Sequence, residues 1–182
     1  SKAQKNMKII AIYNIKGGVG KTTTAVNLAY LSTKMGAKSL VWDLDPQGAA
    51  SFYFRVKPKI KGGTRKLLRG RKTLSDIIRG TNYPTLDLVP ADLSYRNFDL
   101  ALQKGKGKNK AFKRLLKPLQ NQYDFVFLDC PPSFSTLSEN VFSMADILAI
   151  PMIPTTLSVR TFWQLLEFLD KEKMNIKGKE FF

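Results

Sequence analysis

A glycine-rich stretch between residues 17 and 23 has the composition of a phosphate-binding loop. Its three glycines allow backbone N–H groups to turn inward and approach an anion closely. Lys21 can reach terminal phosphates, Thr22 offers a hydroxyl to a magnesium ion, and Thr23 can contact an inner phosphate. We therefore expect a polyphosphate to bind to Gly17, Gly18, Val19, Gly20, Lys21, Thr22 and Thr23.

A second lysine, Lys16, lies five residues before Lys21. The generic phosphate-loop pattern, Gly-x-x-x-x-Gly-Lys-Thr, would place a glycine at position 15, where this chain has Ile15. The spacing therefore departs from the generic motif at its first glycine. Because one lysine is enough to hold a phosphate, Lys16 requires a role of its own.

Buried strands and a helix must position these groups. Residues 8–13 (KIIAIY) form an almost entirely apolar run, which is typical of a strand buried on both faces of a parallel sheet. Apolar residues at helical spacing over 22–35, followed by Gly36, predict a helix whose positive end faces the loop. Residues 39–42 form a second buried strand, which is followed by the acidic residue Asp43. This order of strand, loop, helix and strand predicts an α/β fold.

The remaining segments extend the same pattern. Residues 125–128 (FVFL) form another buried strand, which ends at Asp129. The chain is predicted to be a single domain, 1–182, whose residues 1–6 are a loose terminus or an expression remnant. We also expect strands at 86–89 and 147–150, the beginning of another at 177–182, a short helix after Pro46, helices at 73–79, 92–103, 111–120 and 155–171, a basic polar segment at 55–72 and a mobile loop at 104–110.

The composition excludes several kinds of chemistry. One cysteine and no histidine rule out an internal disulfide and a Ser–His or Cys–His nucleophile, and they disfavour a zinc or iron–sulfur site. No apolar run is long enough to span a bilayer. Acid–base catalysis must then rely on carboxylates or lysines, and we expect Cys130 to be a packed small residue.

Positive charge is the unusual feature of the composition. Thirty Lys and Arg residues face 14 Asp and Glu, which gives a net charge of +16. Many of them lie in two acid-free blocks, 55–72 and 104–117, without the interleaved aromatic residues of a base-stacking surface. Non-specific contact with DNA phosphates is the favoured interpretation. An acidic membrane surface and two merely solvated loops are the alternatives.

Three segments resemble the signatures of the ParA/MinD group of P-loop ATPases. The sequence KGGVGKTT (16–23) is similar to that group's deviant Walker A motif, WDLDPQGAAS (42–51) to the second ParA signature, and YDFVFLDCPPSFS (123–135) to its Walker B region. The Asp-Pro-Gln tripeptide favours the ParA branch over the MinD branch. The chain therefore resembles a ParA/Soj-type partition ATPase, over residues 8 to about 169.

The resemblance implies a fold and a set of site residues. The fold is a three-layer P-loop NTPase with a mostly parallel central sheet flanked by helices, and the family's C-terminal strands are expected to be missing. Lys16 would reach across a dimer to the partner's nucleotide, Lys21 would bind the terminal phosphates, and Asp45 would orient the attacking water. The expected metal-site residues are Thr22, Asp43 and Asp129.

The resemblance also implies a function. ATP and Mg2+ would hold a homodimer on non-specific DNA, and slow hydrolysis to ADP and phosphate would release it during plasmid or chromosome partition. A ParB-like adaptor would stimulate hydrolysis in the cytoplasm, on the nucleoid, with no membrane involved. The alternatives are a MinD-like membrane-associated positioning ATPase and a metabolic ligase or reductase on the same scaffold.

Overall fold

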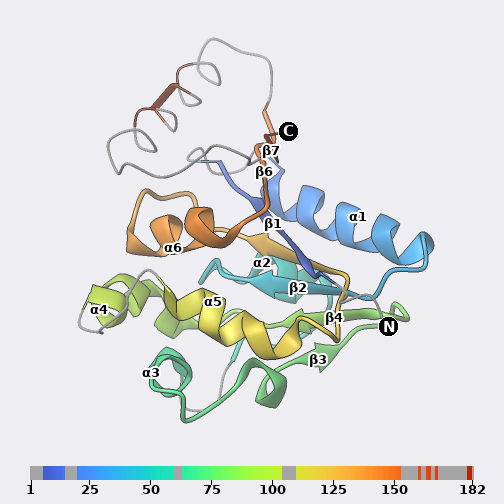
Figure 1. Ribbon diagram of the computed structural model, residues 1–182, viewed down its shortest axis with the longest axis horizontal. Coiled ribbons are helices and arrows are strands. Elements are labelled where there is room, and N and C mark those ends of the chain that lie inside the picture. Colours follow the sequence, from blue (N-terminus) through green and yellow to red (C-terminus); the bar gives the residue numbers. More distant parts are fainter. Residues whose placement is uncertain are drawn as a thin grey trace.

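The computed structural model describes residues 6–14, 20–59, 63–103, 110–152, 160, 163–164, 167 and 180–181. These residues form one seven-stranded sheet with the strand order β3-β4-β2-β5-β1-β6-β7 (Figure 1). Neighbouring strands are parallel except for β3, which runs antiparallel to β4. The strands are β1 (Lys8–Ile12), β2 (Ser39–Asp43), β3 (Arg79–Gly80), β4 (Leu86–Val89), β5 (Phe125–Asp129), β6 (Ile147–Ala149) and β7 (Glu180–Phe181).

Helices cover both faces of the sheet, so the chain has the three layers predicted from its sequence (Figure 1). Helices α1 and α2 contribute to the core on one face, and α3, α4, α5 and α6 contribute to the core on the other. The α-helices are α1 (Lys21–Lys34), α2 (Ala49–Tyr53), α3 (Gly63–Leu68), α4 (Phe98–Gln103), α5 (Ala111–Leu116) and α6 (Thr136–Met144). The 3-10 helices are η1 (Leu74–Asp76), η2 (Leu93–Asn97) and η4 (Lys117–Leu119).

Successive residues of the central strands face the two helical layers alternately. In β1, Ile10 and Ile12 belong to the core beneath α1, whereas Ala11 belongs to the core on the opposite face. In β2, Val41 belongs to the core beneath α1 and Trp42 to the core on the opposite face. Because helices cover both faces, both sets are apolar. The continuous apolar runs therefore predicted these buried strands correctly.

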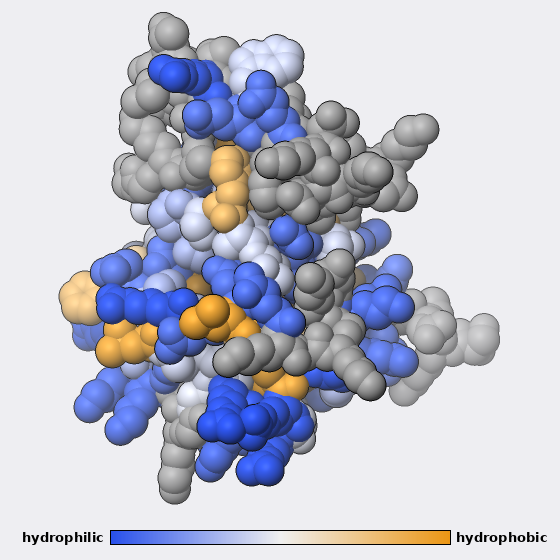
Figure 2. All heavy atoms as spheres, turned by 90° about the vertical axis from the view of Figure 1, so that its left-hand side faces the viewer, coloured by the Kyte–Doolittle hydropathy of each residue, from blue (hydrophilic) through white to orange (hydrophobic). Residues whose placement is uncertain are grey.

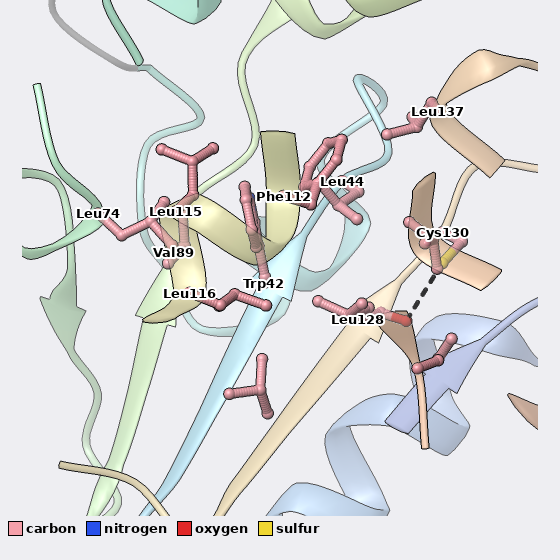
Figure 3. Packing of buried hydrophobic residues seen from close by; sticks show 14 of the residues in the cluster. Trp42, Leu44, Leu74, Val89, Phe112, Leu115, Leu116, Leu128, Cys130 and Leu137 are labelled. Atoms are coloured by element: carbon pink, nitrogen blue, oxygen red, sulfur yellow. Dashed lines mark hydrogen bonds between the residues drawn. The ribbon is translucent and has the colours of Figure 1, made fainter. Parts of the chain in front are cut away.

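Trp42 lies at the centre of the larger core. Its ring centroid is 5.1 Å from that of Phe112 in α5, and its indole Nε1 donates a hydrogen bond to the Tyr95 hydroxyl at 3.2 Å. Figure 3 shows Trp42 beside α5, with Leu115 and Leu116 of that helix nearby. This close packing holds β2, which carries one of the acidic residues of the predicted site, against the helical layer.

Three of the expected helices are shorter or interrupted in the structure. Segment 73–79 makes only the short η1, because Arg79 and Gly80 pair with β4 as an edge strand. Segment 92–103 divides into η2 and α4. Segment 111–120 divides into α5 and η4 at Pro118, whose missing N–H cannot continue the α-helical hydrogen bonds.

Two helices were not predicted from the sequence. Helix α6 follows Ser135, whose Oγ accepts a hydrogen bond from Ser138 N at 3.4 Å, and it buries Leu137 and Val141. A cap and two apolar residues four apart were therefore available as a helix signal. Helix α3 lies inside the basic block 55–72, whose composition was interpreted as an irregular polar segment.

Some predictions lie wholly or partly outside the described residues. They concern the loose terminus, the loop at 104–110 and most of the helix at 155–171. The strand expected near the end of the chain is present as β7, parallel to β6. Among the helices that the structure describes, none has the length and apolar character needed to cross a membrane.

Candidate active site

The carboxyl ends of three neighbouring strands bring the predicted acidic residues together. Asp129 ends β5, and the pairing register places it beside Ile12 of β1 on one side and Asp43 of β2 on the other. Helix α1, which begins at Lys21, follows β1 from this edge of the sheet. In open parallel sheets, ligands bind outside this carboxyl edge.

Thr22 links the start of α1 to the end of β5. Its Oγ1 donates a hydrogen bond to Asp129 Oδ2 at 2.7 Å. Gly20, the residue before α1, has a φ of 80°, a conformation that glycine adopts without steric cost. Its carbonyl accepts a hydrogen bond from Thr24 N at 2.8 Å. Two of the predicted metal-site residues, Thr22 and Asp129, are therefore in direct contact.

A buried lysine and a buried carboxylate lie at this helix end. Lys21 is only 7% exposed, and Asp129 is 1% exposed. Burial raises the pKa of Asp129 to about 6, while the Thr22 hydrogen bond and the positive charge of Lys21 act in the opposite direction. The site thus combines a positive charge and a helix N-terminus, which suit an anion, with a carboxylate, which suits a cation.

Asp43 is held by Ser51, a residue for which the sequence predicted no role. Asp43 Oδ2 accepts hydrogen bonds from Ser51 N at 2.8 Å and from Ser51 Oγ at 2.7 Å. Ser51 Oγ in turn accepts a hydrogen bond from Ala91 N at 2.8 Å. This network ties the end of β2 to α2 and to the segment that follows β4.

The environment of Asp43 disfavours its charged form. The side chain is fully buried, and burial raises its pKa to about 7, although the two hydrogen bonds from Ser51 lower it. The negative charges of Asp129 and Asp45 raise it further. Two carboxylates at paired positions of neighbouring strands therefore compete for the charged state unless a cation lies nearby.

The unsatisfied oxygens of this pair are suitable for a hard divalent cation. Among the described residues, neither Asp43 Oδ1 nor Asp129 Oδ1 has a hydrogen-bond partner, although both atoms are buried. Carboxylate and hydroxyl oxygens are the protein ligands that Mg2+ prefers. The donor set of Thr22, Asp43 and Asp129 therefore fits the predicted magnesium ion.

Asp45 lies on the turn that leaves β2. Its Oδ1 accepts a hydrogen bond from Gln47 N at 2.9 Å, and its backbone carbonyl accepts one from Gly48 N at 2.9 Å. Gly48 has a φ of 71°, and a Cβ there would lie 3.2 Å from Pro58 Cβ, so the turn requires a glycine. The side chain of Asp45 is half-buried at the edge of the site.

Most of the glycine-rich loop lies outside the described residues. This holds for Lys16, Gly17, Gly18 and Val19, whose phosphate-binding and trans-acting roles stay predictions. Thr23 is described, and its side chain is exposed in the first turn of α1.

Cys130, the residue after Asp129, is a packed residue of the core. It is 2% exposed, and its Sγ donates a weak hydrogen bond to the Leu128 carbonyl at 3.5 Å (Figure 3). Burial raises the pKa of its thiol, so the reactive thiolate is disfavoured. This confirms the interpretation made from the sequence.

The parallel sheet, the helix that starts at its carboxyl edge and the Thr22–Asp129 contact define an α/β P-loop NTPase. The family model of the AAA domain matches residues 7–179. The chain belongs to this family, as a P-loop ATPase of the ParA/Soj type.

Two curated relatives are partition or sporulation proteins. The sporulation initiation inhibitor protein Soj of Bacillus subtilis is 36% identical over 146 residues, which cover 80% of this chain and 58% of Soj. The chromosome partitioning protein ParA of Myxococcus xanthus is 32% identical over 170 residues, which cover 93% of this chain and 60% of that protein. The chain thus spans less than two thirds of the length of these relatives.

Solved structures share the fold over nearly the whole chain. A cobyrinic acid a,c-diamide synthase from Mycobacterium smegmatis, with bound ADP and magnesium, is similar with a TM-score of 0.86 and 30% identity, over 96% of this chain and 72% of that one. A plasmid partition protein from Borrelia burgdorferi is similar with a TM-score of 0.83 and 30% identity, over 97% of this chain and 78% of that one. The predicted P-loop architecture is therefore confirmed.

Proposed function

We propose that this chain is the ATPase domain of a ParA-type partition switch. ATP and Mg2+ bind at the carboxyl edge of the sheet, the loaded chain forms a homodimer on non-specific DNA, and slow hydrolysis releases it. The protein acts on the nucleoid, where a ParB-like adaptor on the cargo stimulates hydrolysis. The observation that carries this proposal is the 2.7 Å hydrogen bond from Thr22 to Asp129, which joins a phosphate-binding helix end to a metal-binding carboxylate.

The residues at the edge of the sheet divide the binding between them. The glycine-rich loop and Lys21 bind the terminal phosphates of ATP. Thr22 and Asp129 hold the magnesium ion, and Asp43 supports it from the neighbouring strand. When bound, magnesium neutralises phosphate charge and makes the terminal phosphoryl group easier to transfer.

Two further residues act in hydrolysis. The Asp45 carboxylate accepts a hydrogen bond from the attacking water and orients it toward the terminal phosphorus. Lys16 from the second copy of the dimer neutralises the negative charge that develops as the bond to ADP breaks. Both roles are supported by the resemblance of KGGVGKTT and Asp-Pro-Gln to the ParA signatures.

Two basic segments supply a surface for DNA. Helices α3 and α5 adjoin, because Arg114 Nη2 donates a hydrogen bond to the Leu68 carbonyl at 3.1 Å. Lysines and arginines bind DNA by displacing counterions from phosphates, without reading the base sequence. The exposed basic residues of the segments 55–72 and 104–117 in the described part of the chain are Arg55, Lys57, Lys59, Arg65, Lys66, Arg69, Arg71, Lys110, Lys113, Arg114 and Lys117.

Sedimentation velocity tests the proposal with ATP, with ADP and without nucleotide, each with and without duplex DNA. We expect ATP and magnesium to convert monomers to dimers, and DNA to sediment with the ATP-bound form alone. Asp129→Asn should stay monomeric under all conditions. A chain that binds ATP and magnesium but neither dimerises nor binds DNA would refute the switch.

A synthase is the second candidate function, because a cobyrinic acid a,c-diamide synthase shares the fold with a TM-score of 0.86. Such an enzyme forms an amide at a carboxylate of its substrate. ATP turnover separates the two candidates, because DNA should raise the turnover of a partition ATPase, whereas cobyrinic acid with ammonia should raise that of a synthase. Sedimentation with anionic liposomes and ATP tests the MinD-like alternative.

A further inference from the structure

A groove lies between α3, η2 and α4. Its volume is about 580 Å³, and its walls include Arg65 and Arg69 together with Leu68 and Leu100. None of the described residues that line it is acidic, and none belongs to the candidate active site. The groove therefore combines positive charge with apolar surface away from the ATP site, and its two arginines are also among the basic residues of the proposed DNA surface.

Specific contacts hold the two sides of this groove at a fixed distance. Thr64 N donates a hydrogen bond to Ser94 Oγ at 2.9 Å, and the two hydroxyl groups are 2.5 Å apart. Gly63 has a φ of 61°, and a Cβ there would lie 3.0 Å from Ser94 Oγ. A side chain at position 63 would therefore be strained and would press against Ser94, so glycine suits the close approach of α3 to η2.

The two acidic residues nearest to the groove in the chain both have backbone partners. Asp92 Oδ1 accepts a hydrogen bond from Ser94 N at 2.8 Å, which caps η2. Asp99 Oδ1 accepts one from Leu137 N at 2.8 Å, which ties α4 to α6. Both carboxylates thus accept hydrogen bonds from backbone N–H groups, and neither aspartate is among the described residues that line the groove with the two arginines.

Exposed leucines add apolar surface in and beside the groove. Leu100 is 59% exposed and Leu93 is 64% exposed. Figure 2 shows the side on which α3 and α4 lie, where hydrophobic patches are surrounded by hydrophilic side chains. A DNA backbone offers phosphates to arginine but little apolar surface to leucine, so it leaves these side chains uncovered.

We propose that this groove binds an acidic, amphipathic helical segment of a partner protein. Leucine-type side chains on one face of that helix pack against Leu68 and Leu100. Its carboxylates pair with Arg65 and Arg69, whose planar guanidinium groups suit bidentate contacts. The inference goes beyond the proposed ATPase function and requires neither nucleotide nor DNA.

A fluorescein-labelled helical peptide provides the probe, with leucine at every third or fourth position and glutamate elsewhere. Fluorescence anisotropy is measured as the whole chain is added to this peptide, and to a peptide of the same composition in scrambled order. We expect the scrambled peptide to bind about tenfold more weakly, because it cannot place its leucines on one face. Equal binding of the two peptides would overturn the proposal, since charge attraction alone would then explain it.

Matched variants test the two components of the groove. Leu100→Gln should weaken binding of the helical leucine–glutamate peptide about tenfold. The control is Leu31→Gln, which changes a leucine on α1 that is 55% exposed and should leave peptide binding unchanged. The double variant Arg65→Gln, Arg69→Gln should weaken binding more than Lys113→Gln, Lys117→Gln, which removes two charges at the same spacing from the segment α5–η4.

Three results would refute the docking site in variants whose circular dichroism matches that of the original chain. The first is unchanged binding after Leu100→Gln. The second is an equal loss of binding in the two pairs of charge variants. The third is a loss of duplex DNA binding in the arginine variant while its peptide binding stays intact, which would assign the groove to DNA.

Discussion

The hydroxyl of Thr22 and the carboxylate of Asp129, 107 residues apart in the chain, are joined by a hydrogen bond of 2.7 Å. This contact joins the first turn of α1 to the end of β5. Asp129 Oδ2 accepts the bond, while Asp129 Oδ1 has no hydrogen-bond partner among the described residues. Hydroxyl and carboxylate oxygens, the ligand types that magnesium prefers, therefore lie next to each other.

Replacing Thr22 by alanine should weaken ATP binding about tenfold when magnesium is present and only slightly when it is chelated, because the lost hydroxyl is the proposed metal ligand. Isothermal titration calorimetry in magnesium and in EDTA measures both affinities. Thr22→Ser should restore binding, and Thr33→Ala, near the other end of α1, should not affect it. An equal loss with and without magnesium would indicate a purely structural hydroxyl.

The raised pKa values of Asp43, about 7, and Asp129, about 6, predict how stability depends on pH. Both carboxyls bind protons more tightly in the folded chain than in the unfolded chain, where the ordinary value is 3.8. Their contribution to stability is therefore complete at low pH and is lost as pH rises toward 7. The free energy of unfolding of the unliganded chain should thus fall between pH 5 and 7, by about 2 kcal/mol per pH unit.

Urea unfolding at several pH values measures this dependence. Asp43→Asn removes one of the two titrating groups, so the fall in stability between pH 5 and 7 should become smaller than in the original chain. A pH dependence that is identical in the variant would show that Asp43 titrates outside this range.

Ser51→Ala should destabilise the chain by about 2 kcal/mol, because it removes the hydroxyl that donates to Asp43 and accepts from Ala91 N. The loss leaves a buried carboxylate and a buried N–H with one partner fewer. Thermal and urea unfolding measure the change. The matched control is Ser75→Ala, an exposed serine in η1, and a similar effect in both variants would contradict the prediction.

Lys16→Ala should leave ATP affinity within about threefold of the original and abolish dimerisation or turnover, because the proposed contact of Lys16 is with the partner's nucleotide. Fluorescent-nucleotide titration measures affinity, and phosphate release measures turnover. Lys34→Ala, at the far end of α1, is the control. Undiminished turnover in the Lys16 variant would rule out the trans role.

DNA affinity should fall steeply with salt, because each lysine or arginine that contacts a phosphate displaces about one counterion. Anisotropy titrations of labelled duplex DNA at several salt concentrations give the slope of log K against log salt. Lys113→Gln with Lys117→Gln should reduce the magnitude of that slope by up to about two. Affinity that does not change with salt would remove the basic segments from the DNA surface.

Local sequence predicted the strands of the sheet and the acidic residues at their ends. The runs KIIAIY and FVFL identify strands buried on both faces, because a covered parallel sheet requires apolar side chains on both. Weaker local signals failed. Helix α6 was not predicted, although Ser135 caps it. The helix expected at 73–79 is shorter in the structure because Arg79 and Gly80 pair with β4 in the sheet.

The sequence by itself determined which groups the site contains: the glycine-rich loop, Lys21, Thr22 and the acidic residues that follow buried strands. Only the tertiary structure decided which of them meet. The register of β2 and β5 places Asp43 beside Asp129, and the path of α2 brings Ser51 to Asp43. The Thr64–Ser94 contact joins α3 to η2 in the wall of the groove. Strand pairing and helix packing join residues far apart in the chain, and no local pattern of residue types specifies those distances.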